Sequence, residues 1–219
     1  MGDRLRLRFS KTGKAKYISH LDLMATMQRA LLRAGVELSY SEGFNPHPYM
    51  SAALPLPVGC GSVCELMDIG ASGEFSPEAL PADITAALPE GLQVLDVYVP
   101  KRKFSGIVWL ELKGALYYDY GTPPGAAERL TERFRADSII ISKKTKRGVS
   151  DIDIAPLIRN PEFAKNDELT MTIKVSAQNP TINPENLINA LDGEYGALKP
   201  DFTLFMRTEI FDEDMNVFR

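Results

Sequence analysis

Residues 4–35, RLRLRFSKTGKAKYISHLDLMATMQRALLRAG, contain the two patterns that decide the fold of the first half of the chain. Residues 4–9 alternate charged and apolar side chains, and this period of two predicts a half-buried strand. Residues 19–34 carry apolar side chains at helical spacing and are followed by Gly35, which predicts an α-helix with a glycine at its C-terminal end. Ser19, with Asp22 three residues later, is the predicted N-cap.

The segments that follow complete a β-α-β-β-α-β pattern. Their sequences predict strands over residues 50–54, 63–69 and 93–99, and a helix that begins at Ser76-Pro77-Glu78 and runs to about residue 88. After a basic linker at residues 100–103, the second half predicts strands over 107–115, 138–144, 169–176 and 202–210, and helices over 123–136 and 183–191. We therefore expect an α+β fold of two tandem ferredoxin-like (βαββαβ) domains with antiparallel sheets, residues 1–100 and 104–219.

Composition restricts the class of protein. The chain has 219 residues, is 44% hydrophobic and 25% charged, and has no apolar run of the roughly 20 residues that a membrane helix requires. It also lacks a signal-peptide core at its N-terminus, and its only two cysteines are too few for a secreted disulfide framework. These features predict a cytoplasmic protein without a membrane partner.

Positive charge is concentrated although the formal net charge is −4. Residues 1–48 hold eight basic and four acidic side chains, and further basic clusters lie at residues 101–103 and 143–147. Such clusters are often only solvated surface, but they also suit an anionic partner such as RNA. Sheet-based modules that bind single-stranded RNA use basic and aromatic side chains together.

The two histidines are the sharpest candidates for chemistry. His20 falls in the first helical turn, next to Tyr17, Ser19 and Asp22, where it could be a structural residue, a ligand contact or a general base. Its helical phase places it on the apolar side, with Leu21 and Leu32, which favours the structural role. His47 lies in the loop GFNPHP at residues 43–48, where the flanking prolines stiffen the backbone and favour a ligand contact.

Metal and cofactor sites are not expected. Cys60 and Cys64 could complete a zinc site with His20 and His47, but their spacing is not that of a zinc knuckle, so two buried small residues are favoured. Phosphate-loop and dinucleotide fingerprints are absent from the sequence, which argues against a nucleotide cofactor.

Seven motifs resemble a known family: FSKTG at Phe9, YISHLDLM at Tyr17, QRALLRAG at Gln28, YSEGFNPHP at Tyr40, LPLPVG leading to Ser62 and Glu65, KKTKRG at Lys143 and IDIAPLI at Ile152. In this order they resemble the radical SAM-linked proteins, formerly a domain of unknown function (DUF2344). The resemblance implies a bacterial cytoplasmic protein that occurs beside, or fused to, a radical SAM enzyme. Ala155 stands where the family often has a basic residue. The chain also lacks the C-x-x-x-C-x-x-C cluster of a radical SAM catalyst.

These observations lead to one main hypothesis and two alternatives. The main hypothesis is an accessory protein that binds RNA or presents a substrate to a radical SAM enzyme in tRNA or rRNA modification. The predicted phosphate contacts are Lys11, Lys14, Lys16, His47, Lys144 and Lys146. The predicted pocket residues are Tyr17, His20, Tyr40 and Phe44, with Ser19, Asp22 and Asn45 beside them. The alternatives are a metal-independent ribonuclease with His20 or His47 as general base and Lys11 as charge stabiliser, and a protein-only scaffold for a radical SAM partner.

Overall fold

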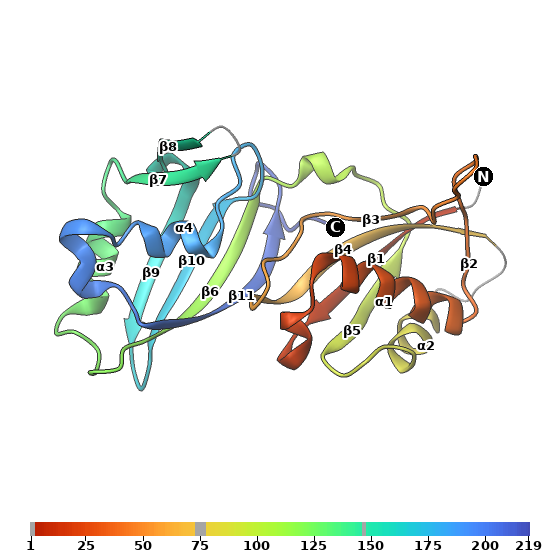
Figure 1. Cartoon of the computed structure of the whole chain (residues 1–219), viewed down its shortest axis with the longest axis horizontal. Helices are drawn as coiled ribbons and strands as arrows, with labels where there is room; N and C mark the ends of the chain where they lie inside the picture. Colours follow the sequence, from red (N-terminus) through yellow and green to blue (C-terminus); the bar gives the residue numbers. More distant parts are fainter. Residues whose placement is uncertain (1–2, 73–77, 146–147) are drawn as a thin grey trace. The chain divides into compact units, whose positions relative to one another are not determined.

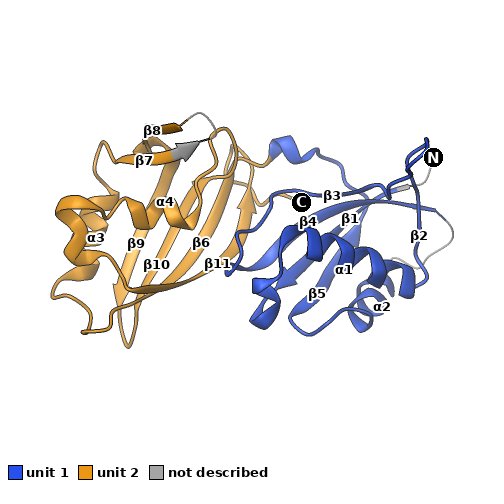
Figure 2. Ribbon diagram, viewed as in Figure 1, with its two compact units in different colours: residues 1–106, 219 blue, residues 107–218 orange. Residues whose placement is uncertain are grey.

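The computed structural model describes residues 3–72, 78–145 and 148–219. The chain divides into two compact units, residues 1–106 with Arg219 (unit 1) and residues 107–218 (unit 2), as Figure 2 shows. Each unit combines β-strands with a few helices, so the predicted mixed α+β class is confirmed. None of the helices in the described part of the chain has the length and apolarity that a membrane crossing requires.

Unit 1 is built around the strand predicted at residues 4–9. Its elements in chain order are β1 (Asp3–Lys11), the 3₁₀ helix η1 (Gly13–Tyr17), α1 (His20–Arg33), β2 (Glu37–Leu38), β3 (Met50–Ala52), β4 (Gly61–Ser72), α2 (Leu80–Ala86), β5 (Leu92–Tyr98) and the 3₁₀ helix η2 (Phe104–Gly106). β1 lies between β5 and β4 and is antiparallel to both, while β2 and β3 pair with successive parts of β4 (Figure 1). Ser76 and Pro77, the predicted start of the second helix, lie outside the described residues.

The period-two pattern of β1 separates the core of unit 1 from its other sheet face. Leu5, Leu7 and Phe9 are buried in a core that α1 and α2 cover. Arg4, Arg6 and Arg8 alternate with them and therefore belong to the opposite face. The α1 residues in this core are Leu23, Met27, Ala30 and Leu31.

The N-terminus of α1 is capped as predicted. The Ser19 hydroxyl accepts a hydrogen bond from the Asp22 backbone N–H (3.2 Å) and donates one to the Asp22 carboxylate (2.7 Å). The predicted apolar side was wrong for Leu21 and Leu32, which are exposed. The buried face of α1 is instead formed by Leu23, Met27, Ala30 and Leu31. This face is rotated about the helix axis relative to the apolar side that the sequence predicted.

Ser19→Ala is expected to lower the free energy of unfolding by about 1 kcal/mol, because the N–H of Asp22 loses its acceptor. Urea unfolding followed by circular dichroism measures this change. Ser105→Ala is the matched control, since Ser105 is exposed and its side chain makes no hydrogen bond within the described residues. Equal losses in the two variants would show that the cap contributes nothing.

Unit 2 contains four neighbouring antiparallel strands. Its elements are β6 (Trp109–Tyr117), α3 (Ala126–Phe134), β7 (Ile140–Thr145), β8 (Gly148–Asp153), the 3₁₀ helix η3 (Ala155–Leu157), β9 (Ile158–Lys165), β10 (Leu169–Ser176), α4 (Pro184–Asn189), the 3₁₀ helix η4 (Gly193–Leu198) and β11 (Phe202–Phe211). Within the unit, the sheet order is β11-β6-β10-β9, with antiparallel neighbours. α3 and α4 lie over one face of this sheet (Figure 1).

One predicted strand of unit 2 has a different role. Residues 138–144 were expected to be a middle strand, but β7 pairs with β8 in a separate two-stranded hairpin. β9 pairs with β10 instead. The sequence did not reveal β9 because Pro161 and the positive backbone φ of Asn160 (47°) interrupt its pattern.

Candidate functional site

β2 and β3 pair with β4 on either side of Gly70. The GFNPHP loop, residues 43–48, lies between these two short strands in the sequence. The Ser39 N–H donates to the Gly70 carbonyl (2.9 Å), and the Gly70 N–H donates to the Tyr49 carbonyl (2.7 Å). A Cβ atom on Gly70 would lie 3.1 Å from the Tyr49 Cβ and 3.3 Å from the Ser39 Cβ. A glycine therefore lets the chain leave and rejoin the sheet at one residue of β4.

Two hydrogen bonds between Ser41 and His47 close the base of the GFNPHP loop. The Ser41 N–H donates to the His47 carbonyl (2.8 Å), and the His47 N–H donates to the Ser41 hydroxyl (2.9 Å). Pro46 and Pro48 restrict the backbone around His47, so the loop is held in a narrow range of conformations. Residues 42–47 are all exposed, and the Phe44 side chain is exposed completely. The loop thus presents an aromatic ring and an imidazole to solvent.

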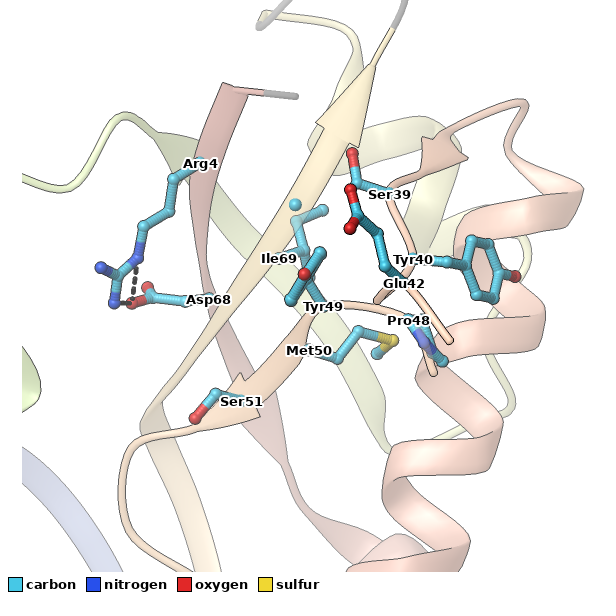
Figure 3. Close-up of a pocket in the computed structure, with 11 residues that line it drawn as sticks. Arg4, Ser39, Tyr40, Glu42, Pro48, Tyr49, Met50, Ser51, Asp68 and Ile69 are labelled. Atoms are coloured by element: carbon cyan, nitrogen blue, oxygen red, sulfur yellow. Dashed lines mark hydrogen bonds and ion pairs between the residues drawn. The ribbon is translucent and has the colours of Figure 1, made fainter. Parts of the chain in front are cut away.

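A pocket of about 880 Å³ lies between the base of this loop and the sheet (Figure 3). Its lining residues are Arg4, Ser39, Tyr40, Glu42, Pro48, Tyr49, Met50, Ser51, Asp68, Ile69 and Gly70. In Figure 3, Arg4 and Asp68 lie on one side of β4, and Ser39, Tyr40 and Glu42 lie on the other. Aromatic and apolar walls with a few polar groups are typical of a ligand site.

The positive side of the pocket is Arg4, which shares the Asp68 carboxylate with the buried Arg6. Arg6 is fully buried and donates from Nε to Asp68 Oδ1 (2.6 Å) and from Nη2 to Asp68 Oδ2 (3.0 Å). The Arg4 guanidinium also pairs with Asp68 Oδ2, with its Nε at 3.0 Å, but its side chain is 55% exposed. Two guanidinium groups against one carboxylate leave one net positive charge, and Arg4 carries it to solvent.

Lys11 was predicted to contact phosphate, but the structure places it in the interior. Its side chain is buried, and its Nζ donates to the backbone carbonyl oxygens of Ile18 (2.9 Å) and Lys16 (3.4 Å). Burial lowers the pKa of Lys11 below its ordinary value, and the nearby Glu65 partly offsets this effect. Lys11 therefore fastens the segment that precedes α1 and is not a surface cation.

The other predicted residues of the first motif gather at the start of α1. Tyr17 is exposed, with the Lys16 Nζ 5.1 Å from its ring centroid. Ser19 and Asp22 form the cap, and the half-buried His20 is the first residue of the helix. Within the described residues, the imidazoles of His20 and His47 are not hydrogen-bonded to a carboxylate.

The structure does not bring the two predicted groups into one pocket. The group around Tyr17 and His20 lies beside Lys11, at one end of β1, whereas the loop lies beside Gly70, which pairs with Arg4 at the other end. Arg4 and Lys11 are seven residues apart on this strand, or roughly 23 Å at 3.3 Å per residue. Tyr40 lines the pocket, and the loop that holds Phe44, Asn45 and His47 adjoins it.

The predicted lysines of the second half lie on the β7–β8 hairpin or next to it in sequence. Lys143 donates from Nζ to the Thr181 carbonyl (2.9 Å). Lys144 is paired with Val149 in the hairpin register, and Lys146 lies outside the described residues. A phosphate contact by these lysines stays a prediction.

Both cysteines are buried thiols that are not joined in a disulfide bond. Cys64 lies within β4, and Cys60 is the residue immediately before β4. Both lie near the Lys11 end of β1. His47 lies near the opposite end, so the structure does not gather the four residues of the zinc alternative. No group of three or more His, Cys, Asp or Glu side chains that could hold a metal ion occurs in the described part of the chain.

Of the residues that line the pocket, only Tyr40 was predicted from the sequence as a ligand contact; the charged and aromatic residues that were missed are Arg4, Glu42, Tyr49 and Asp68. Arg4 was read only as part of an alternating strand, and Glu42 and Tyr49 flank the recognised loop. One signal for Asp68 was available, because a lone carboxylate within the apolar run LMDIGA needs a cationic partner when that strand is buried.

The molecule is thus a two-unit α+β protein with a ligand-sized pocket beneath a stiff, aromatic loop. Residues 4–184 match the family described as "Uncharacterized protein conserved in bacteria (DUF2344)". The chain belongs to this family, in agreement with the resemblance of its motifs. The family match includes residues 4–106 of unit 1, with the loop and the pocket.

Comparisons with characterised proteins add no functional argument. Among curated proteins, none matches this chain. Among solved structures, DyPB from Rhodococcus jostii RHA1 (crystal form 2) aligns with 94% of this chain and 93% of that chain at 13% sequence identity. The TM-score of 0.22 is too low for this likeness to support a shared fold or function.

Proposed function

We propose that this protein is a cytoplasmic accessory protein that binds an unpaired segment of RNA and presents it to a radical SAM enzyme for tRNA or rRNA modification. The supporting observation is the pocket, where Tyr40 and Tyr49 lie with Arg4 beneath a loop that exposes the Phe44 ring. Unpaired bases stack on aromatic side chains, and phosphates pair with arginine. The radical SAM partner rests on the resemblance of the sequence motifs alone.

The arrangement of strands supports the proposal as well. We propose that residues 1–100 and 104–219 are two ferredoxin-like domains. The supporting orders are β5-β1-β4, followed by β2 and β3, in unit 1 and β11-β6-β10-β9 in unit 2. In the second domain, the β7–β8 hairpin is an insertion whose sequence, KKTKRG at residues 143–148, is strongly basic. A basic two-stranded ribbon suits contacts with a phosphate backbone.

Catalysis is left to the partner enzyme in this proposal. The ribonuclease alternative would use His20 or His47 as a base and Lys11 to stabilise charge. Lys11 is buried against backbone carbonyl oxygens, and the two imidazoles lie at opposite ends of β1. The geometry therefore favours binding over cleavage.

Phe44→Ala is expected to lower the yield of RNA crosslinked to the protein in its own cells by about 5- to 160-fold, because one stacked base contributes about 1–3 kcal/mol. The measurement is ultraviolet crosslinking followed by sequencing of the bound RNA. Tyr120→Ala is the matched control, since Tyr120 is an equally exposed aromatic residue of unit 2. An undiminished yield from Phe44→Ala would contradict the role of the loop. Co-purification of a radical SAM enzyme without RNA would favour the scaffold alternative.

A further inference from the structure

We infer that the pocket holds a single guanine nucleotide, turned out of the RNA strand, with its phosphate on Arg4 and its base edge on Glu42. This inference rests on the proposed function and adds the substrate class of the same site. It joins two groups of opposite charge that line one cavity and lie on opposite sides of β4 (Figure 3).

The phosphate position follows from the unequal burial of the two arginines. Arg6 is inaccessible, binds both oxygens of Asp68, donates to the Arg102 carbonyl (2.9 Å) and lies over the Phe104 ring (4.2 Å). Arg6 therefore neutralises Asp68 without help from Arg4. The Arg4 Nη1 makes no hydrogen bond within the described residues, and a guanidinium has five donors. Arg4 can thus bind a phosphate oxygen while it keeps its contact with Asp68.

The middle of the pocket suits a planar ring. Gly70 lines the pocket on β4, and because it has no side chain, Tyr49 and Ser39 approach the strand closely and form the walls beside it. Tyr49 immediately precedes β3, and its side chain is half exposed, so one face of its ring is available for stacking. A volume of about 880 Å³ lies within the range of small-molecule sites, about 300–1,000 Å³, and is far too small for a duplex.

Glu42 determines which base is accepted. A carboxylate repels phosphate, so Glu42 does not bind the same part of the ligand as Arg4. It accepts hydrogen bonds only, and its two oxygens match two parallel donors. Guanine presents two adjacent N–H donors on its Watson–Crick edge, whereas uracil presents one N–H between two carbonyl oxygens. The pocket should therefore prefer guanine to uracil.

The test compares fluorescently labelled UUGUU and UUUUU RNA by anisotropy, with unlabelled GMP and guanosine as competitors. Wild-type protein is expected to bind UUGUU about 5- to 160-fold more tightly, since a good bidentate contact with a base discriminates by about 1–3 kcal/mol. Glu42→Gln should remove most of this preference. Arg4→Gln should weaken binding of both oligonucleotides and abolish the advantage of GMP over guanosine. Arg29→Gln, at an exposed position of α1, should change neither.

The outcomes separate this inference from the proposed function. Equal binding of the two oligonucleotides by wild-type protein, or a guanine preference that survives Glu42→Gln, overturns the inference. If Phe44→Ala still reduces RNA crosslinking in that case, the proposed function stands. If wild-type protein binds neither oligonucleotide and recovers no cellular RNA, both fail. Binding of GMP measured directly by isothermal titration calorimetry, without binding of UUGUU, overturns the RNA source and assigns the pocket to a free nucleotide.

Discussion

Asp68→Ala is expected to lower the free energy of unfolding by about 3–5 kcal/mol, because it leaves the buried charge of Arg6 without its carboxylate. After this substitution, the Arg6 guanidinium keeps the Arg102 carbonyl and the Phe104 ring, and neither carries a negative charge. Urea unfolding at neutral pH measures the loss. The midpoint is expected to fall without a change in the slope of the transition.

Arg4→Ala is the control for this prediction, since it removes the other partner of the same carboxylate. Arg4 is 55% exposed, so its ion pair is expected to contribute about 1 kcal/mol or less. The contrast between the two substitutions isolates the effect of burial. If Asp68→Ala and Arg4→Ala cost the same, then Arg6 is hydrated in solution, and the argument that Arg4 carries the net charge of the pocket loses its basis.

The Arg6–Asp68 pair shows how far the sequence alone could predict unit 1. The alternation in residues 4–9 correctly predicted a strand, but the prediction that this strand is half-buried does not hold at Arg6. It could not predict that Arg6 is buried, because its partner lies 62 residues away and its cover comes from Phe104. A period-two pattern predicts which face of the sheet a side chain occupies, whereas the burial of that side chain depends on contacts between distant segments.

For the candidate site as well, the sequence predicted one feature, the stiff loop, and not the other, the pocket. The stiffness of the GFNPHP loop was evident from Pro46 and Pro48. The pocket depends instead on Gly70, where β2, of only two residues, and β3 meet a single strand. A two-residue strand has no periodicity to detect, so its register could not be read from the sequence. The separation of His20 from the loop was hidden for the same reason.

In unit 2, the error concerned the partners of a strand, not its existence. β7 was predicted close to its observed limits. Its predicted place in the sheet was wrong because β9 was not predicted, since Asn160 and Pro161 interrupt the pattern of that strand. The basic sequence of the hairpin was recognised, and its separation from the main sheet was not.

Gly91→Ala is expected to lower the free energy of unfolding by about 2–5 kcal/mol, the sum of a left-handed backbone cost of about 1–2 kcal/mol and a clash of about 1–3 kcal/mol. Gly91 has a φ of 89°, and a Cβ atom there would lie 2.5 Å from the Thr12 carbonyl oxygen and 2.9 Å from the Ala15 Cβ. The Thr12 backbone cannot move away easily, because its N–H donates to the Gly91 carbonyl (2.7 Å).

The matched control is Gly121→Ala. Gly121 has nearly the same φ, 87°, but no atom of the described residues lies within 4 Å of the added Cβ. It should therefore show only the backbone cost of about 1–2 kcal/mol. Thermal and urea unfolding of both variants measure the difference, which is the contribution of the close contact between Gly91 and the segment that Lys11 fastens. Equal losses at the two glycines would mean that this segment yields to the added methyl group, and the start of α1 would then be less firmly held than the hydrogen bonds of Thr12 and Lys11 indicate.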